Sequence, residues 1–272
     1  MAGHRNRPLT AFALAVFAFL FAPIVILIVF SFNASRRSIV WHGFTLDWYP
    51  RLLENQHLLD ALGVTLRLAA VAVVISTVLG TLLGLALARA RLRGRSGIES
   101  LLLLPMITPE IVMGLSLLLF FLQLFDAHGG FGQLSVAHIT FCLSYVAITV
   151  RARAAGLDAN LEEAARDLGA SAVGAFRYVT LPLIMPGVAA GAMLAFALSF
   201  DDYVVTTFNA GVGSSTLPLY IYGRIKFGIT PEINAISTII VAITAIAIFL
   251  AWRFGHLGRG SEAIAAAAEP TA

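Results

Sequence analysis

The sequence predicts an all-α membrane protein with six transmembrane helices. Three observations predict this class: an apolar composition, six long apolar runs, and basic residues gathered at the ends of those runs. Apolar residues make up 59% of the 272 residues and charged residues only 12%, whereas soluble domains are about 45–50% apolar and about 25% charged. A helix needs about 20 mainly apolar residues to cross a bilayer. The expected spans are residues 10–32, 63–88, 98–125, 134–150, 183–200 and 233–252.

The first run, residues 10–32, carries no charge. A secretory signal peptide is the rival interpretation, but its apolar region is shorter, about 7–15 residues, and a small-residue cleavage site follows it. The sequence Ser31-Phe32-Asn33-Ala34 is a poor cleavage site, which favours a spanning helix.

Two further stretches shape the expected helices. The segment after the first span is polar and aromatic, and its residues 49–62 are expected to form a short amphipathic helix on the outer surface. The third span, residues 98–125, contains Pro105 and Pro109, each of which removes a helical hydrogen bond. That span is therefore expected to be interrupted.

Six crossings place both termini on the same side of the membrane. Cytoplasmic loops of membrane proteins carry an excess of Lys and Arg. Twelve basic residues lie on the side of the termini: Arg5, Arg7, Arg89, Arg91, Arg93, Arg95, Arg151, Arg153, Arg166, Arg177, Arg253 and Arg259. Six lie on the other side: Arg36, Arg37, Arg51, Arg67, Arg224 and Lys226. Both termini and the loop around Glu163 are therefore expected in the cytoplasm.

A charged segment between the fourth and fifth spans has the signals of two short helices. Asn160 followed three residues later by Glu163 predicts a helix start with a capping box. Gly169 predicts the end of that helix. Ser171 can cap a second short helix, and Pro182 is suited to open the next long one. The segment therefore predicts a compact helix–turn–helix element on one side of the membrane.

The same segment carries a spaced pattern: Glu-Ala-Ala, three residues, Gly, nine residues, a β-branched residue, any residue, and Leu-Pro. The pattern is made by Glu163, Ala164, Ala165, Gly169, Val179, Leu181 and Pro182. It resembles the cytoplasmic-loop signature of permease subunits in binding-protein-dependent ABC importers, which more often have Ile at the position of Val179. The resemblance implies a type I importer fold in which this loop, the coupling helix, docks on a nucleotide-binding subunit. Glu163 would be the charged contact, Ala164 and Ala165 the close-packing surface, and Gly169 the turn.

An ordinary surface loop with solvated charges is the alternative interpretation of this segment. For Glu162, Arg166 and Asp167, a solvated face and a contact with a partner both stay open. The chain contains no Gly-x-x-x-x-Gly-Lys-Ser/Thr phosphate loop, the motif that binds ATP phosphates. No cofactor is therefore expected in this chain, and ATP and Mg²⁺ would be bound by a partner ATPase.

A narrower resemblance covers nearly the whole chain except its tail. It is carried by Ser31-Phe32-Asn33, Trp41-His42-Gly43-Phe44-Thr45, Ser199-Phe200-Asp201-Asp202-Tyr203, Thr216-Leu217-Pro218 and the run from Phe227 to Ala235. These segments are similar to spermidine/putrescine-type permeases, and in particular to the second permease subunit of such importers. The resemblance implies a bacterial inner-membrane heterodimer with a sister permease, two cytoplasmic ATPase subunits and a periplasmic substrate-binding protein. Relatives with similar permeases take polyamines, 4-aminobutyrate-like compounds, opines or aminoalkylphosphonates, so the substrate stays open.

Glu110 is the first candidate for the substrate path. A charge near the middle of a bilayer is costly and usually faces an interior or a water-filled cavity. Glu110 lies about 18 Å into the third span, near the middle of a ~30 Å core. It either lines the path and attracts a cation, or bonds to freed backbone or to a partner subunit.

Asp201, Asp202 and Tyr203 form a second candidate group at the end of the fifth span. Carboxylates for charge and a ring for cation–π contact would suit an organic ammonium at the outer mouth of the path. The alternative is a helix end that pairs with Arg224, Lys226 or a partner chain.

Two other function classes stay open. An ion-gradient-driven secondary transporter would explain Glu110 but not the spaced loop pattern. A membrane enzyme would need a clustered catalytic set, whereas the six histidines are scattered and form no His-x-x-x-His or His-Glu-x-x-His pair, the spacings that hold zinc. No metal site and no nucleic-acid partner are expected.

The expected organisation has three parts. Residues 1–62 would be the first spanning helix with a periplasmic segment, residues 63–253 the importer core, and residues 254–272 a cytoplasmic tail. The single cysteine, Cys142, lies in an apolar run and is expected to be a small buried residue.

Overall fold

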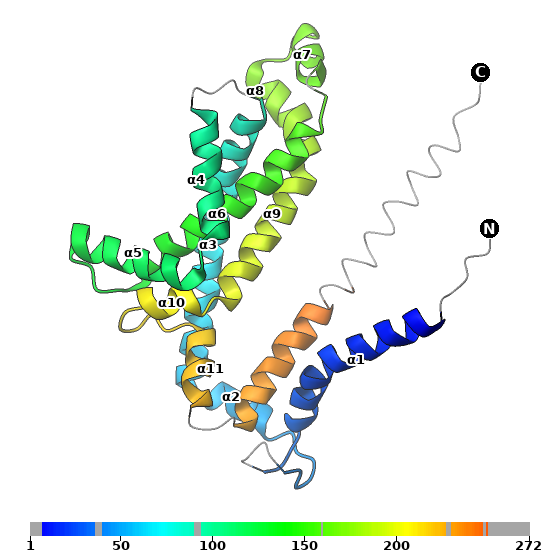
Figure 1. Ribbon diagram of the computed structural model, residues 1–272, viewed down its shortest axis with the longest axis vertical. Coiled ribbons are helices and arrows are strands. Elements are labelled where there is room, and N and C mark those ends of the chain that lie inside the picture. Colours follow the sequence, from blue (N-terminus) through cyan, green and yellow to red (C-terminus); the bar gives the residue numbers. More distant parts are fainter. Residues whose placement is uncertain are drawn as a thin grey trace. The chain divides into compact units, whose positions relative to one another are not determined.

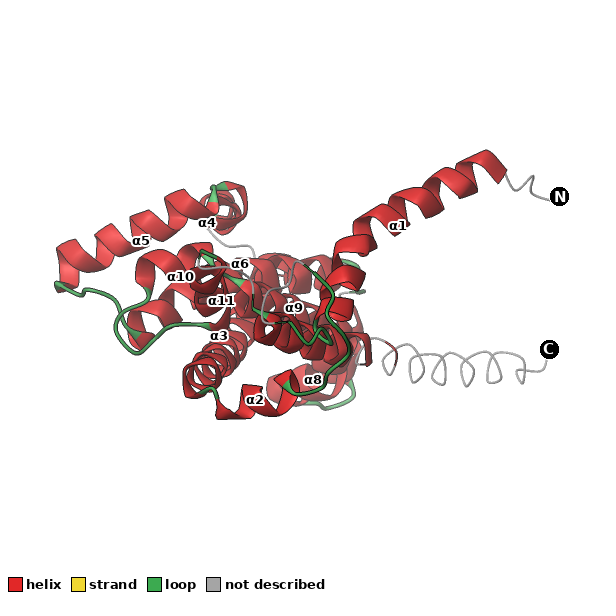
Figure 2. Cartoon of the chain, turned by 90° about the horizontal axis from the view of Figure 1, so that it is seen from below, coloured by secondary structure: helices red, strands yellow, loops and turns green. Residues whose placement is uncertain are grey.

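The computed structural model describes residues 7–35, 40–89, 94–158, 160–226, 230–246 and 249. Over these residues the chain is helical, apart from turns, loops and one isolated bridge between Asn33 and Phe44 (Figures 1 and 2). The helices are α1 (Arg7–Phe30), α2 (Trp48–Glu54), α3 (Gln56–Arg89), α4 (Arg95–Ile107), α5 (Glu110–Phe125), α6 (Phe131–Ala155), α7 (Asn160–Asp167), α8 (Ala172–Ala175), the π-helical turn η1 (Phe176–Thr180), α9 (Leu181–Asp201), α10 (Val204–Asn209) and α11 (Leu217–Ile225). An apolar helix at Pro231–Ile246 follows them. The all-α prediction is confirmed.

The chain divides into two compact units. The core unit contains His57–Gly223, and the terminal unit joins Met1–Gln56 with Arg224–Ala272. Every candidate site residue named above lies in the core unit.

The core unit is organised around α6 and α9, which pack against each other, with α3 against α6 (Figure 1). Its apolar interior includes Phe141, Val146, Val150, Ile184 and Ala195. Glycines allow the close approach: a Cβ added at Gly84 of α3 would lie 2.4 Å from the carbonyl oxygen of Ala147. Helices in lipid gain little from apolar burial against one another, so small residues that admit close backbone packing take that role.

Four of the described helices are long and apolar enough to cross a membrane: Pro8–Phe30, Gln56–Arg89, Phe131–Ala155 and Ala172–Asp201. They match the first, second, fourth and fifth expected spans. The prediction of a surface helix over residues 49–62 is wrong about where this helix ends. α2 stops at Glu54, and the residues from Gln56 onward already belong to α3.

The third expected span is not continuous. α4 ends at Ile107, α5 begins at Glu110, and the two helices bend by 112° at the break. A proline drives the residue before it to extended backbone, and Thr108 accordingly has a ψ of 132° before Pro109. Counting the bent pair as one span gives five candidates in the described part of the chain, so the expected count of six is not reproduced. In the sixth expected span, residues 233–252, the structure has a shorter apolar helix at Pro231–Ile246. Residues 247, 248 and 250–252 lie outside the described residues.

Beyond the bend, α5 packs on α10. A Cβ added at Gly114 would lie 2.9 Å from Cδ2 of Phe208. Asn209 Nδ2 donates to the carbonyl oxygen of Gly114 (3.1 Å), and Gln133 Nε2 of α6 donates to Asn209 Oδ1 (3.0 Å). Buried hydrogen bonds therefore fix α5 to α10 and α6 close to the break.

In the terminal unit, the loop after α1 is folded around one asparagine. The buried side chain of Asn33 donates to the carbonyl oxygen of Val40 (2.7 Å) and accepts from the N–H of His42 (2.9 Å). The indole Nε1 of Trp48 donates to the backbone oxygen of Asn33 (2.8 Å). α1 itself exposes apolar side chains such as Phe12 and Phe19, a surface suited to lipid.

Candidate functional site

The residues of the spaced pattern begin on α7, which lies at one end of the core unit (Figure 1). α7 stops at Asp167, and Gly169 has a φ of +90°. The N–H of Gly169 donates to the oxygen of Arg166 (2.9 Å), and the N–H of Ala170 donates to the oxygen of Ala165 (3.0 Å). Glycine adopts this left-handed backbone without strain, so Gly169 ends the first short helix where its sequence position predicts.

The helix caps of this element follow the prediction only in part. Ser171 Oγ accepts from the N–H of Gly174 (3.1 Å) and caps α8 as expected. The N–H of Asn160, which the predicted capping box assigned to Glu163, donates to Asp158 Oδ1 (2.9 Å). Glu163 is thereby left to point outward from α7.

The second short helix is not separate from the fifth span. α8, η1 and α9 run as one helix, Ala172–Asp201, so Leu181 and Pro182 lie inside a long helix and not at its start. Pro182 cannot donate a helical hydrogen bond, and the π-helical turn η1 directly precedes Leu181. π-helical turns are one of the distortions that allow a helix to continue past such a defect.

The predicted contact residues of α7 are open to solvent in this chain. Glu163 and Ala164 are exposed and Ala165 is half-buried. Leu168 is 90% exposed, and Tyr178 on η1 is also exposed. Exposed apolar side chains beside small residues form a surface suited to another protein.

Glu162 is a residue whose role the sequence left open, and the structure gives it partners within the chain. Its carboxylate forms ion pairs with Arg89, at the end of α3, and with Arg166, one turn along α7. It also accepts a hydrogen bond from Thr180 Oγ1 (3.0 Å). The i,i+4 spacing predicts the contact with Arg166, but no sequence signal predicts the one with Arg89.

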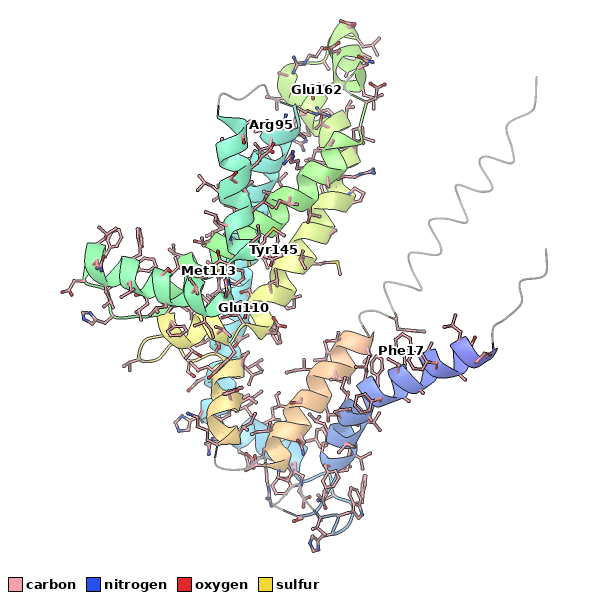
Figure 3. The ribbon with its side chains drawn as sticks, in the orientation of Figure 1. Phe17, Arg95, Glu110, Met113, Tyr145 and Glu162 are labelled. Carbon is pink, nitrogen blue, oxygen red and sulfur yellow. The ribbon has the colours of Figure 1, made fainter. Side chains whose placement is uncertain are left out.

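The four candidate path residues line one cavity in the core unit. It has a volume of about 280 Å³ and is lined by Pro105, Glu110, Met113, Phe141, Tyr145, Leu198, Asp201, Asp202, Tyr203, Val204 and Val205. Glu110, Met113 and Tyr145 lie around the bend between α4 and α5 and the facing part of α6 (Figure 3). Among these described lining residues there are three carboxylates and no basic side chain, so the cavity has an acidic character.

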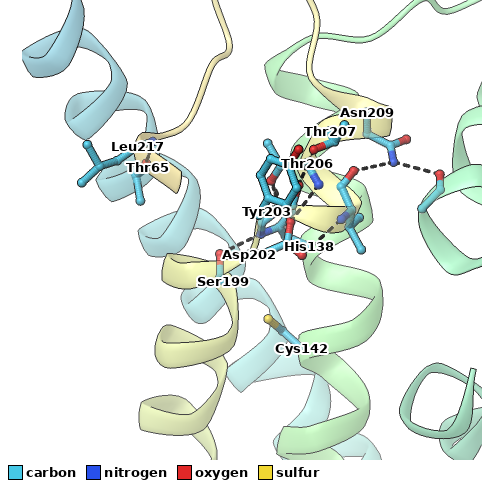
Figure 4. A network of polar contacts seen from close by, with 12 residues as sticks. Thr65, His138, Cys142, Ser199, Asp202, Tyr203, Thr206, Thr207, Asn209 and Leu217 are labelled. Atoms are coloured by element: carbon cyan, nitrogen blue, oxygen red, sulfur yellow. Dashed lines mark hydrogen bonds and ion pairs between the residues drawn. The ribbon is translucent and has the colours of Figure 1, made fainter. Parts of the chain in front are cut away.

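Asp202 holds the break between α9 and α10 together. Its side chain is 7% exposed. It accepts hydrogen bonds from the N–H groups of Val205 (3.2 Å) and Thr206 (2.8 Å) and from the Thr206 hydroxyl (2.8 Å). His138 Nε2 lies 3.5 Å from Asp202 Oδ2 and 3.2 Å from Thr206 Oγ1 (Figure 4). Asp202 thus caps α10, and its carboxylate lies beside the imidazole of His138 on α6.

The hydrogen bonds around His138 also assign its protons. The single hydroxyl proton of Thr206 goes to Asp202, so Thr206 Oγ1 must accept from Nε2–H of His138. His138 is fully buried, and its other nitrogen, Nδ1, lies 2.9 Å from Ser199 Oγ. In the neutral ring, that nitrogen accepts the Ser199 proton. His138 is not among the site residues predicted from the sequence, because nothing in the sequence around a single histidine in an apolar run indicates which residues it contacts.

Asp201 and Tyr203 differ from Asp202 in their surroundings. Asp201 is exposed at the last turn of α9, on the cavity. The ring of Tyr203 stacks on that of Tyr222 with 4.1 Å between centroids. Glu110, the first residue of α5, is also exposed at the cavity. Over the described residues, no cluster of His, Cys, Asp or Glu is arranged to hold a metal ion.

Comparison with known proteins decides the family. Residues 76–259 match the family described as "Binding-protein-dependent transport system inner membrane component". The chain belongs to this family. The family consists of non-catalytic membrane subunits of ABC importers, so the chain is a multi-pass permease. This membership decides against the secondary transporter and the membrane enzyme.

Two curated relatives are similar over most of their length. The spermidine/putrescine transport system permease protein PotC of Escherichia coli K12 is 44% identical over 235 residues, 86% of this chain and 89% of the relative. The putrescine transport system permease protein PotI of the same strain is 40% identical over 242 residues, 87% of this chain and 86% of the relative. The expected resemblance to spermidine/putrescine-type permeases is confirmed.

Solved structures support the fold. A chain of a bacterial ABC transporter involved in the import of alginate, an acidic polysaccharide, has a TM-score of 0.67 at 17% identity, covering 94% of this chain and 98% of that one. A chain of an amino acid ABC transporter has a TM-score of 0.52 at 22% identity, covering 79% of this chain and 96% of that one. The fold is that of a type I ABC importer permease.

Proposed function

We propose that this permease forms part of the translocation path for a polyamine, or for a related amine-containing solute, in an ATP-driven importer. The observation that carries the substrate class is the cavity in which Glu110, Asp201 and Tyr203 come together, with no basic side chain among its described lining residues. The names of the relatives, which are putrescine and spermidine permeases, support the same class.

The cavity suits a flexible organic cation for electrostatic reasons. In a low-dielectric surrounding, an exposed carboxylate attracts an ammonium group more strongly than it would in water. Glu110 and Asp201 supply two such groups from different helices, and Tyr203 supplies a ring face for cation–π contact. Asp202 contributes less to binding, because its oxygens already accept three hydrogen bonds.

The proposed assembly includes a sister permease, two cytoplasmic ATPase subunits and a periplasmic binding protein. The exposed side chains of Glu163, Ala164 and Leu168 support docking of α7 on an ATPase. The excess of arginines near that end supports a cytoplasmic position for α7 and for both termini. One of the structurally similar transporters was solved with its periplasmic protein bound, and an equivalent partner is proposed here.

The test is uptake of labelled putrescine by cells that depend on this importer, with Glu110→Gln and Asp201→Asn compared with Asp126→Asn. Asp126 is an exposed carboxylate at the far end of α5, outside the cavity, with a φ of 50° that Asn tolerates. Each cavity variant is expected to lower kcat/KM about tenfold, the equivalent of one weak charge contact, while Asp126→Asn leaves it unchanged.

Equal uptake in all three variants would contradict the cationic path. Competition separates the alternatives for the substrate: 4-aminobutyrate, an opine or an aminoalkylphosphonate should not compete with putrescine. Strong competition by one of these, retained in both cavity variants, would assign the importer to that compound.

A further inference from the structure

The carboxylate of Glu162 joins three segments that are far apart in the sequence. Arg89 ends α3, Glu162 lies in the first turn of α7, and Thr180 ends η1. Glu162 Oε2 contacts both Arg89 Nη1 and Thr180 Oγ1, and Arg89 Nη1 donates in turn to Thr180 Oγ1 (3.2 Å). The three side chains therefore form a closed triangle, which we call the Arg89–Glu162–Thr180 clamp.

The side chains of the clamp are partly shielded from water. The side chains of Arg89 and Glu162 are 26% and 22% exposed, and Thr180 is fully buried. Glu162 Oε1 accepts a further hydrogen bond from Arg166 (2.8 Å). Partly buried, charge-assisted hydrogen bonds are stronger than ordinary surface pairs and are screened less by salt.

The clamp connects α7 to two long helices of the core unit. α3 reaches from Gln56 to Arg89, and the continuous helix that contains Thr180 ends at Asp201, on the acidic cavity. α9 continues from Thr180 through 21 residues to end at Asp201, about 30 Å of helix. A displacement of α7 would reach the cavity only if α7 is held firmly to these two helices.

The neighbouring glutamates of α7, Glu162 and Glu163, face different surroundings. Successive residues of a helix point about 100° apart, so Glu162 faces α3 and η1 while Glu163 is exposed. Removing Glu163 would change the outer surface of α7, whereas removing Glu162 would loosen its attachment and leave that surface intact.

We propose that Arg89, Glu162 and Thr180 are positioning residues that make α7 move as one body with α3 and α9. This inference rests on the proposed function, in which α7 docks on the ATPase. Without the clamp, the ATPase still binds and hydrolyses ATP, but less of its movement reaches the cavity.

The test uses the complete importer in proteoliposomes and measures putrescine imported per ATP hydrolysed, together with the ATPase retained on the purified complex. The variants are Glu162→Gln, Arg89→Gln and the uncharged change Thr180→Val. Glu99→Gln is the matched control, because Glu99 also bridges two arginines, Arg95 (2.6 Å) and Arg151 (3.0 Å), at a similar exposure. These residues belong to α4 and α6 and not to α7.

Transport per ATP is expected to fall about three- to tenfold in the three clamp variants, the population change that accompanies loss of one hydrogen bond of ordinary strength. ATPase retention should be unchanged, and Glu99→Gln should behave as the unaltered protein. Arg89→Lys, which keeps the charge, should recover part of the ratio. An unchanged ratio in all clamp variants would overturn the proposal. Parallel loss of ATPase and transport would also overturn it, since the residues would then only fold the docking surface.

Failure of the underlying proposal has a different signature. Gly169→Val strains the left-handed turn below α7 and Glu163→Lys reverses the exposed charge, so both should release the ATPase. If both retain it, α7 is not the docking element. If both variants release the ATPase while Glu162→Gln keeps the normal ratio of putrescine imported to ATP hydrolysed, the docking proposal stands and only the proposed role of the clamp is wrong.

Discussion

Adjacent acidic residues at the end of α9 have different physical surroundings. Asp202 is buried, caps α10 and contacts His138. Asp201 is exposed at the cavity. The sequence presents them as a pair, and only the backbone break between α9 and α10 separates a structural carboxylate from an accessible one.

This difference predicts that the same substitution has effects of very different size at the two positions. Asp202→Ala should lower the free energy of unfolding by about 2–4 kcal/mol, because it removes a helix cap and leaves buried donors unsatisfied. Asp201→Ala should change stability by less than ~0.5 kcal/mol, as expected for an exposed residue without such contacts. Thermal unfolding in detergent checks both, and equal shifts for the two variants would refute the assignment.

Single residues also show where sequence reasoning reaches its limit. The stop at Gly169 and the cap at Ser171 were predicted because both depend on local backbone chemistry. The contacts of Glu162 with Arg89 and of Asp202 with His138 were not, since each joins residues more than sixty positions apart. Such pairs depend on helix packing, which a single sequence does not specify.

Among the elements, the break between α4 and α5 agrees with the expected interruption of the third span. The continuity of α8, η1 and α9 departs from expectation. Both involve proline, and the outcomes are opposite. At Pro109, which follows an extended Thr108, the helix axis turns by 112° between α4 and α5. At Pro182, which follows the π-helical turn η1, the helix continues. The sequence predicts a local defect at each proline, but packing decides whether the helix turns or continues. α5 turns because α10 and Asn209 hold it.

Close packing of α3 on α6 predicts a sharp difference between two glycines. Gly84→Ala would place a methyl group 2.4 Å from a backbone oxygen of α6, and such overpacking costs about 1–3 kcal/mol. Gly97→Ala on α4 meets no atom within 4 Å and should be neutral or stabilising by up to ~1 kcal/mol, since Ala favours helix. Thermal unfolding of the two variants checks this, and destabilisation by Gly97→Ala of the same size would contradict it.

At the scale of the whole molecule, the fold class and the family follow from composition, apolar runs and one spaced pattern. These features suffice because a lipid environment permits few architectures. The count of six spans is not reproduced over the described residues, because the third span is a bent pair and the last span is described only in part. The acidic cavity could not be predicted from the sequence, because its residues come from α4, α5, α6, the end of α9 and the start of α10.

The central claim is that the end of the core unit bearing α7 lies in the cytoplasm and contacts an ATPase. The most direct test places a cysteine at position 163 by Glu163→Cys, in a chain whose only native cysteine, Cys142, is buried. His128→Cys, at an exposed loop between α5 and α6, reports the opposite side of the membrane. Each variant is treated with a membrane-impermeant maleimide in spheroplasts and in inverted vesicles, and then with a short bifunctional crosslinker.

Position 163 should be labelled only in inverted vesicles and should crosslink to the ATPase subunit, whereas position 128 should be labelled only in spheroplasts. Labelling of position 163 in intact spheroplasts, or the absence of any ATPase crosslink from it in the assembled importer, would contradict the account.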